Sequence, residues 1–444
     1  MMDQTQPRPS GPKPPRPASA VSTGTGMAGL AGLIIWVSVS RTYGMDGSWS
    51  ALANVAACGL PMVLWSLLVD KVHLRVSTGL DWAQPRLLRQ SVDVSLVKLA
   101  GLWATWAVIA GVYALGRWYW RGNYLFAMEL FEAAVPFLLV ASIPYVLWLD
   151  RYLKEPRDGA WHFGTWLIGQ PGWKGSEIAH HARAWAVKGF FLAFMISIVP
   201  GGFGEVVRRP AAEILANPIS VASWLISLMF VIDVAFATVG YLLTMKPLDA
   251  HIRTANPYMQ GWVAALICYP PFVLMGESGV LYYQTATYGD SGWMRWFEGY
   301  PLLLSIWGAI LVALTALYAW ATVAFGLRFS NLTDRGILTH GPYALSKHPA
   351  YLAKNSFWWL ATLPFLVTNG NTVDAVRNTV TLALVSGVYF WRARTEERHL
   401  SADPDYRAYA AWMEAYGPVP RLIRAITGRP AKSWPAPAPD STQV

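Results

Sequence analysis

The chain has 444 residues, of which 54% are hydrophobic and only 14% are charged. Soluble domains carry about a quarter charged residues, so this composition excludes an ordinary soluble enzyme. The apolar residues form long blocks, and many of the 24 tryptophans stand near block ends, where indole rings favour the lipid headgroup layer. We therefore expect an all-α, polytopic membrane protein in contact with the lipid bilayer.

The net charge of +9 does not indicate a nucleic-acid partner, because no basic stripe with interleaved aromatic residues is present. Cys58 and Cys268 lie in separate apolar blocks, so neither a disulfide framework nor a metal site is expected. Residues 1–26 are rich in Pro, Ser, Thr and Gly, a composition that predicts a disordered tail, and we expect a second disordered tail at 426–444.

Apolar runs predict about ten transmembrane helices, of which the first, seventh and ninth are short for a crossing of about 20 residues. The predicted spans cover residues 27–41, 49–69, 95–115, 125–150, 185–204, 218–245, 260–275, 301–325, 354–369 and 374–391.

The connections between these spans alternate in charge. With the N-terminus inside, the inside connections hold 25 Lys and Arg residues and the outside connections hold five. This bias is what the positive-inside rule predicts, so we expect both termini on the cytoplasmic side of the membrane, the inner or plasma membrane if the source is bacterial.

Two modules follow from this division. Residues 27–275 make a seven-span membrane module without a motif that assigns its role, and residues 300–425 make a second membrane module. Asp233 lies in the middle of the span 218–245, where a charge costs about 2.5–3.5 kcal/mol. It belongs either to a polar substrate cavity or to a buried structural hydrogen bond. The sequence does not indicate the oligomeric state.

Polar residues gather in the loop before the predicted helical hairpin and in the tail after it. A hairpin with its turn around Asn369-Gly370-Asn371 returns the chain to the membrane face that it left, so loop and tail meet there. The loop carries Gly341-Pro342-Tyr343 and Lys347-His348-Pro349 with Tyr351; the tail carries Arg392, Arg394, Glu396, Glu397, Leu400, Tyr406 and Tyr409.

Over residues 325–425 this pattern resembles the isoprenylcysteine carboxyl methyltransferase family. The resemblance implies methyl transfer from S-adenosylmethionine at the cytoplasmic face to a lipid or lipid-linked amphiphilic acceptor that enters from the bilayer. The implied cofactor-binding residues are Gly341, Tyr343, His348, Pro349, Tyr351 and Glu397, and the implied catalytic residues are Arg392, Arg394, Glu396 and Glu397. The chain departs from the family where Lys347 replaces an Arg and where Lys354 and Asn355 replace smaller residues.

The residue chemistry fits methyl transfer, which needs two positioned reactants and stabilised charge. Glu396 or Glu397 can accept hydrogen bonds from the ribose or the ammonium of the cofactor, and His348 can donate to its carboxylate. Tyr343 or Tyr351 can offer a ring face to the sulfonium. An anionic acceptor group suits a tail arginine, either Arg392 paired with Glu396 or Arg394 paired with Glu397.

Two other functions remain open. Membrane sterol reductases use a similar His-Pro loop and C-terminal tyrosines to bind NADPH, although the chain shows no phosphate-binding arginine cluster. Alternatively, the additional spans and Asp233 belong to a transporter or a scaffold, in which the C-terminal module is vestigial; no internal repeat supports this.

Overall fold

The computed structural model describes residues 14–277, 279–284, 292–366 and 370–428, and it is mostly helical. Within these residues, seven helices are long and apolar enough to cross a membrane, which is compatible with a multi-pass membrane protein. They are α1 (Thr23–Tyr43), α2 (Ser48–Leu68), α3 (Leu88–Gly116), α4 (Leu125–Tyr152), α6 (Gly175–Arg208), α8 (Pro218–Leu242) and α11 (Pro301–Val323).

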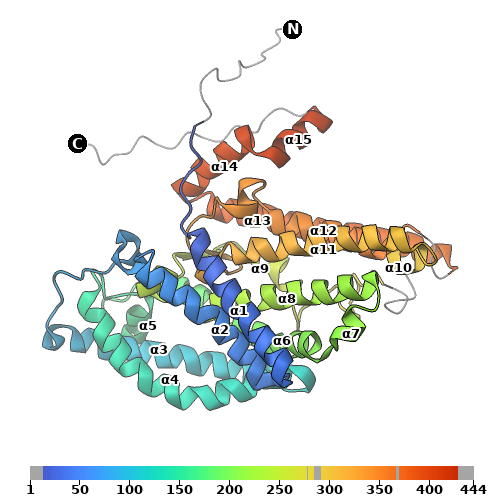
Figure 1. The fold of residues 1–444 in the computed structure, drawn as a ribbon. Helices are drawn as coiled ribbons and strands as arrows, with labels where there is room; N and C mark the ends of the chain where they lie inside the picture. The colour runs from blue at the N-terminus through green and yellow to red at the C-terminus, as the bar shows by residue number, and fades with distance from the viewer. Residues whose placement is uncertain (1–13, 278, 285–291, 367–369, 429–444) are drawn as a thin grey trace, which may run out of the picture.

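Shorter elements connect and extend these helices (Figure 1). The α-helices are α5 (Gly159–Leu167), α7 (Ala211–Ile214), α9 (Met259–Leu266), α10 (Trp293–Trp296), α12 (Pro349–Thr362), α13 (Thr372–Leu400), α14 (Pro404–Tyr416) and α15 (Pro418–Thr427). The 3₁₀ turns are η1 (Val72–Leu74), η2 (Val76–Thr78), η3 (Gly122–Tyr124), η4 (Lys246–Leu248), η5 (Gly326–Arg328) and η6 (Gly341–Ala344). Strands β1 (Thr254–Ala255) and β2 (Thr333–Asp334) pair antiparallel.

The predicted seventh span, 260–275, is wrong as a helix. Helix α9 has eight residues and ends at Leu266, about 12 Å of helix, which is too short to cross a bilayer. Pro270 and Pro271 follow, and neither supplies the backbone N–H that a continuing helix needs. An apolar run alone therefore did not distinguish a spanning helix from a short helix followed by an irregular segment.

The chain nevertheless returns across the bundle in this region. Helices α8 and α11 lie side by side and run in the same direction, because Asp233 of α8 accepts hydrogen bonds from Tyr318 and Thr322 of α11. Nearer the start of both helices, Gly308 of α11 lies against Ala222 of α8. The connection from Leu242 to Pro301 must therefore travel back along their length, and its described residues are largely non-helical. Irregular backbone at membrane depth is tolerated when protein covers it.

The predicted hairpin corresponds to α12 and α13, which pack through Trp359 and Ser386. Asn371 caps the start of α13, and Asn369, also placed in the predicted turn, lies outside the described residues. Helix α12 has 14 residues, fewer than a full crossing needs.

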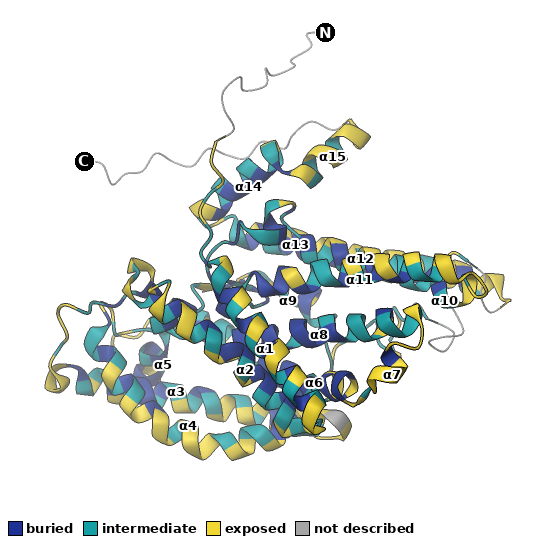
Figure 2. Ribbon diagram, viewed as in Figure 1, coloured by how far each residue is buried: buried dark blue, intermediate teal, exposed yellow. Residues whose placement is uncertain are grey.

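The two predicted modules share one core. Ala319 and Val323 of α11 pack in the same hydrophobic cluster as Leu33 of α1, Met62 of α2 and Phe236 of α8. Figure 2 shows this burial as dark segments on the inner helices, whereas α4 and α15 carry long exposed stretches.

Residues 14–26, predicted to be disordered, are part of the fold. The backbone N–H of Ala20 donates to the carbonyl of Ile337 over 2.9 Å, and Ser22 caps α1. Composition missed this segment because its partner, the loop after α11, is distant in sequence. Residues 1–13 and 429–444 lie outside the described residues, and α15 continues to Thr427, past the predicted start of the second tail.

Connections that were predicted to share the inside lie together at one end of the bundle. Arg75 reaches Asp249 over 3.5 Å, and the backbone N–H of Arg253 donates to Asp334. At the other end, Arg208 pairs with Asp46 over 3.1 Å. The alternation of the predicted spans therefore agrees with the fold; the membrane side of each end stays a prediction.

Candidate functional site

The loop after α11 and the end of α13 enclose a cavity of about 180 Å³. Its walls come from the end of α11, much of the polar loop, the first turns of α12, the last turns of α13 and the start of α14. Residues of this loop–tail cavity include Tyr269, Tyr318, Thr322, Asn331, Tyr343, Lys347, His348, Tyr351, Lys354, Tyr389, Arg392, Glu396, His399, Tyr406 and Tyr409. The predicted meeting of loop and tail is therefore present in the structure.

Two buried guanidinium groups, those of Arg328 and Arg335, hold the polar loop in place. Arg335 donates to the backbone carbonyls of Gly240, Leu327 and Phe329 over 2.8 Å. Arg328 pairs with Asp249 over 2.5 Å. Burial, with the nearby Arg328 charge, lowers the pKa of Arg335 to about 9. All of these donors serve the protein itself, so this pair shapes the loop instead of binding a ligand.

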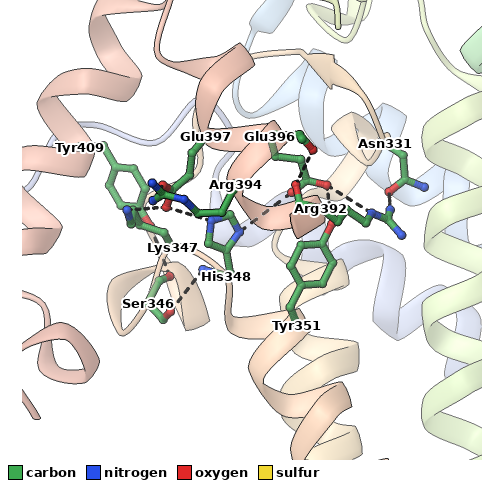
Figure 3. A network of polar contacts seen from close by, with 11 residues as sticks. Asn331, Ser346, Lys347, His348, Tyr351, Arg392, Arg394, Glu396, Glu397 and Tyr409 are labelled. Atoms are coloured by element: carbon green, nitrogen blue, oxygen red, sulfur yellow. Dashed lines mark hydrogen bonds and ion pairs between the residues drawn. The ribbon is translucent and has the colours of Figure 1, made fainter. Parts of the chain in front are cut away.

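Glu397 lies beside the loop–tail cavity, in contact with the lining residues Lys347 and His348, and receives three donors (Figure 3). Lys347 Nζ lies 2.5 Å and His348 Nε2 3.2 Å from its Oε1, and Arg394 lies 3.1 Å from its Oε2. Burial alone raises the pKa of the Glu397 carboxyl, but the hydrogen bond from His348 and the Lys347 ammonium outweigh it and lower the pKa to about 2. Glu397 is therefore a fixed anion that holds the His-Pro loop against α13.

Glu396 faces the cavity on the other side of His348. It accepts a hydrogen bond from the Tyr351 hydroxyl, and Arg392 Nε lies 3.5 Å from the same Oε1. The rings of His348 and Tyr351 stack with their centroids 5.7 Å apart and their planes 7° from parallel. This stack places a carboxylate, an imidazole and a phenol along one wall.

Arg392 is a buried cation of the cavity wall, with 3% of its surface exposed. Its guanidinium donates to the Asn331 side chain and lies 5.4–5.9 Å from the ring centres of Tyr269, Tyr351 and Tyr389. Arg392 Nε has no hydrogen-bond partner among the described residues. A guanidinium held in this way is preorganised for an anionic or planar polar group.

Gly341 and Pro349 shape the site without lining it, and Tyr409 ties α14 to the loop. Gly341 adopts φ +57°, and a Cβ there would lie 3.3 Å from Trp320 Nε1. Pro349 opens α12 at its first turn. The Tyr409 hydroxyl donates to the carbonyl of Tyr343 over 2.8 Å, which ties α14 to the loop.

Lys354 and Asp233 continue the polar region toward the bundle. Lys354 lines the cavity, and its ammonium lies 5.2–5.6 Å from the ring centres of Tyr318, Trp358 and Tyr389. Asp233 accepts from Tyr318 over 2.8 Å and from Thr322 over 2.5 Å, both of which line the cavity. Of the two alternatives for Asp233, the buried hydrogen bond is therefore present, and its partners Tyr318 and Thr322 line the cavity.

The structure separates the two arginine–glutamate pairs that the sequence left as alternatives. Arg392 with Glu396 lines the cavity, whereas Arg394 with Glu397 lies beside it, and the Arg394 side chain is half exposed. Of the other implied residues, Tyr343, His348 and Tyr351 line the cavity, and Gly341 and Pro349 do not.

Several cavity residues were not predicted. Asn331 opens the polar loop, but nothing in its neighbourhood marks it as a partner of Arg392. Tyr269 belongs to the run that was interpreted as a span, and Tyr389 lies within a predicted span. Aromatic residues in apolar runs carry no local signal for a polar site; only the tertiary fold reveals them.

The described residues contain no group of three or more His, Cys, Asp or Glu side chains close enough to hold a metal ion. The cavity instead offers the Glu396 carboxylate beside the Tyr351 phenol, the cations Lys354 and Arg392, and several aromatic faces. Comparisons of the chain with protein-family models, with curated proteins and with solved structures find no match.

Proposed function

We propose that the chain is an integral-membrane methyltransferase that transfers a methyl group from S-adenosylmethionine to a lipid or lipid-linked amphiphilic acceptor at the cytoplasmic face. The observation that carries the proposal is the loop–tail cavity. The two short stretches that resemble isoprenylcysteine carboxyl methyltransferases, 341–351 and 392–409, both line one cavity with charged groups at one end of an apolar bundle.

The cavity offers complementary groups for the cofactor. The Glu396 carboxylate is suited to the ribose hydroxyls or the ammonium, and the His348 imidazole to the carboxylate. Aromatic faces and a carboxylate also favour a sulfonium cation. S-Adenosylmethionine supplies the electrophilic methyl group; the protein has only to hold donor and acceptor in line and to keep water out.

Lys354 and Arg392 are the groups that would bind the methyl acceptor. Both line the cavity, and Lys354 has no carboxylate within ion-pair distance among the described residues. Arg392 Nε makes no hydrogen bond among the described residues, although it lies 3.5 Å from Glu396 Oε1. An anionic headgroup would satisfy both cations while its hydrocarbon part stays among the helices.

The test is equilibrium binding of tritiated S-adenosylhomocysteine to the full-length protein in lipid nanodiscs, with NADPH measured in parallel. We expect saturable binding that Glu396→Gln weakens about tenfold, because a charge-assisted hydrogen bond is worth about 1.5–3 kcal/mol. Glu205→Gln is the matched control, since Glu205 is exposed at the opposite end of the bundle. Binding of NADPH alone would instead favour the reductase, and binding of neither would contradict the cofactor assignment.

A further inference from the structure

A second cavity, of about 360 Å³, lies between α3 and α6 in the N-terminal part of the chain. It has twice the volume of the loop–tail cavity and shares no lining residue with it. In Figure 1 the helices that enclose it, α3, α5 and α6, lie together at the side opposite α14 and α15. The methyl transfer proposed for the loop–tail cavity gives no role to this second cavity.

The cavity is a slot between two parallel helices. Thr105 of α3 and His181 of α6 are joined by a hydrogen bond of 2.8 Å, and the Tyr113 hydroxyl donates to the carbonyl of Gly189 over 3.1 Å. The two bonds are eight residues apart on each helix, which is about 12 Å along the axes. Both pairs line the slot, so its two ends are fixed by polar contacts.

The walls between these ends are aromatic and apolar. The rings come from α5, α6, α9 and the segments beside them: Trp118, Phe163, Trp185, Phe190, Trp262 and Phe272. An apolar cavity of this size holds no stable water and destabilises the helices around it when it is empty. A hydrocarbon group is therefore the expected filling.

One polar atom distinguishes the slot from a gap filled by ordinary lipid chains. The Thr105 hydroxyl donates its single proton to the carbonyl of Gly101 over 2.7 Å. It must therefore accept from His181 Nε2–H, which leaves Nδ1 of the neutral imidazole as an acceptor. His181 is 9% exposed, and Nδ1 has no hydrogen-bond partner among the described residues.

The occupant must supply one neutral donor. A hydrocarbon chain alone would leave Nδ1 desolvated and unpaired, which is unfavourable. An ammonium group would need a carboxylate, and none lines the slot. The imidazole also stands near the start of α6, two turns from Gly175, where the polar end of an amphiphile lies.

We propose that this slot binds a lipophilic alcohol, whose hydroxyl donates to His181 Nδ1 and whose hydrocarbon part lies between α3 and α6. The site would give the N-terminal spans a binding role of their own. The inference does not depend on methyl transfer at the loop–tail cavity.

The test compares an alcohol with its methyl ether, which cannot donate a hydrogen bond. Full-length protein in nanodiscs is titrated with tritiated 1-dodecanol and with dodecyl methyl ether; cholesterol and its methyl ether form a parallel pair for fused-ring alcohols. We expect saturable binding of at least one alcohol and about fivefold weaker binding of its ether. Equal affinity in both pairs, or no saturable binding, overturns the proposal.

Substitutions in and beside the slot test whether His181 accepts the hydrogen bond of the alcohol. His181→Phe keeps a ring of similar size but removes the acceptor, so alcohol and ether should bind equally. His180→Phe, on the neighbouring residue outside the slot, should retain the difference. Ala186→Phe places a ring in the slot at an exposed position and should remove binding of both compounds. A difference that persists in His181→Phe overturns the assignment to Nδ1.

Discussion

The Glu397 carboxylate provides the most quantitative prediction. Its pKa falls from an ordinary value of 4.5 to about 2, and each tenfold change in proton affinity corresponds to about 1.36 kcal/mol. Because the side chain is only 9% exposed, we expect the ionised group to stabilise the folded chain by about 3 kcal/mol at neutral pH. A carboxyl whose pKa is lowered on folding contributes fully above pH 4.5 and loses that contribution as the pH falls toward 2.

The perturbation is Glu397→Gln, which keeps the shape of the side chain and removes its charge. Equilibrium unfolding in mixed micelles with increasing dodecyl sulfate should show a loss of about 3 kcal/mol at pH 7. At pH 3 the native protein has itself lost about 2 kcal/mol, so the variant should differ by only about 1 kcal/mol. Glu205→Gln should change neither value. An equal cost of Glu397→Gln at both pH values would refute the assignment of the charge.

Three further predictions concern the loop–tail cavity. Tyr351→Phe removes the hydroxyl that holds Glu396, so we expect about fivefold weaker S-adenosylhomocysteine binding in the same nanodisc assay, with no change for the exposed Tyr43→Phe. Gly341→Ala forces a side chain into φ +57° beside Trp320 and should lower the free energy of unfolding by about 1–2 kcal/mol in mixed micelles. Lys354→Met should raise the KM for the acceptor roughly tenfold in a methyl-transfer assay and leave cofactor affinity unchanged.

Sequence reasoning located the long helices because their apolar runs exceed the thickness of a bilayer. The predicted span 218–245 and helix α8, Pro218–Leu242, differ by only three residues at one end. It failed at 260–275, where hydropathy does not distinguish a crossing helix from a short helix followed by an irregular segment. It failed also at residues 14–26, whose order depends on a loop more than 300 residues away.

The location of the candidate site was predictable from the sequence, but the hydrogen bonds and ion pairs within it were not. A hairpin necessarily brings 341–351 and 392–409 to one face, and the structure has them there. The choice between Arg392 and Arg394 depends on which side of α13 is buried, and that is set by tertiary packing. Likewise, the pairing of Arg392 with Asn331 joins residues 61 positions apart.

The central claim is tested most directly by following the methyl group. Membranes that contain the full-length protein are incubated with S-adenosylmethionine labelled in its methyl group, and label is measured in the lipid and protein fractions. The account predicts label in a lipid or lipid-linked product with the native chain and with Glu205→Gln, and a loss of most label with Glu396→Gln. Label no higher than in membranes without the protein, across lipid extracts from the source cells, would contradict it.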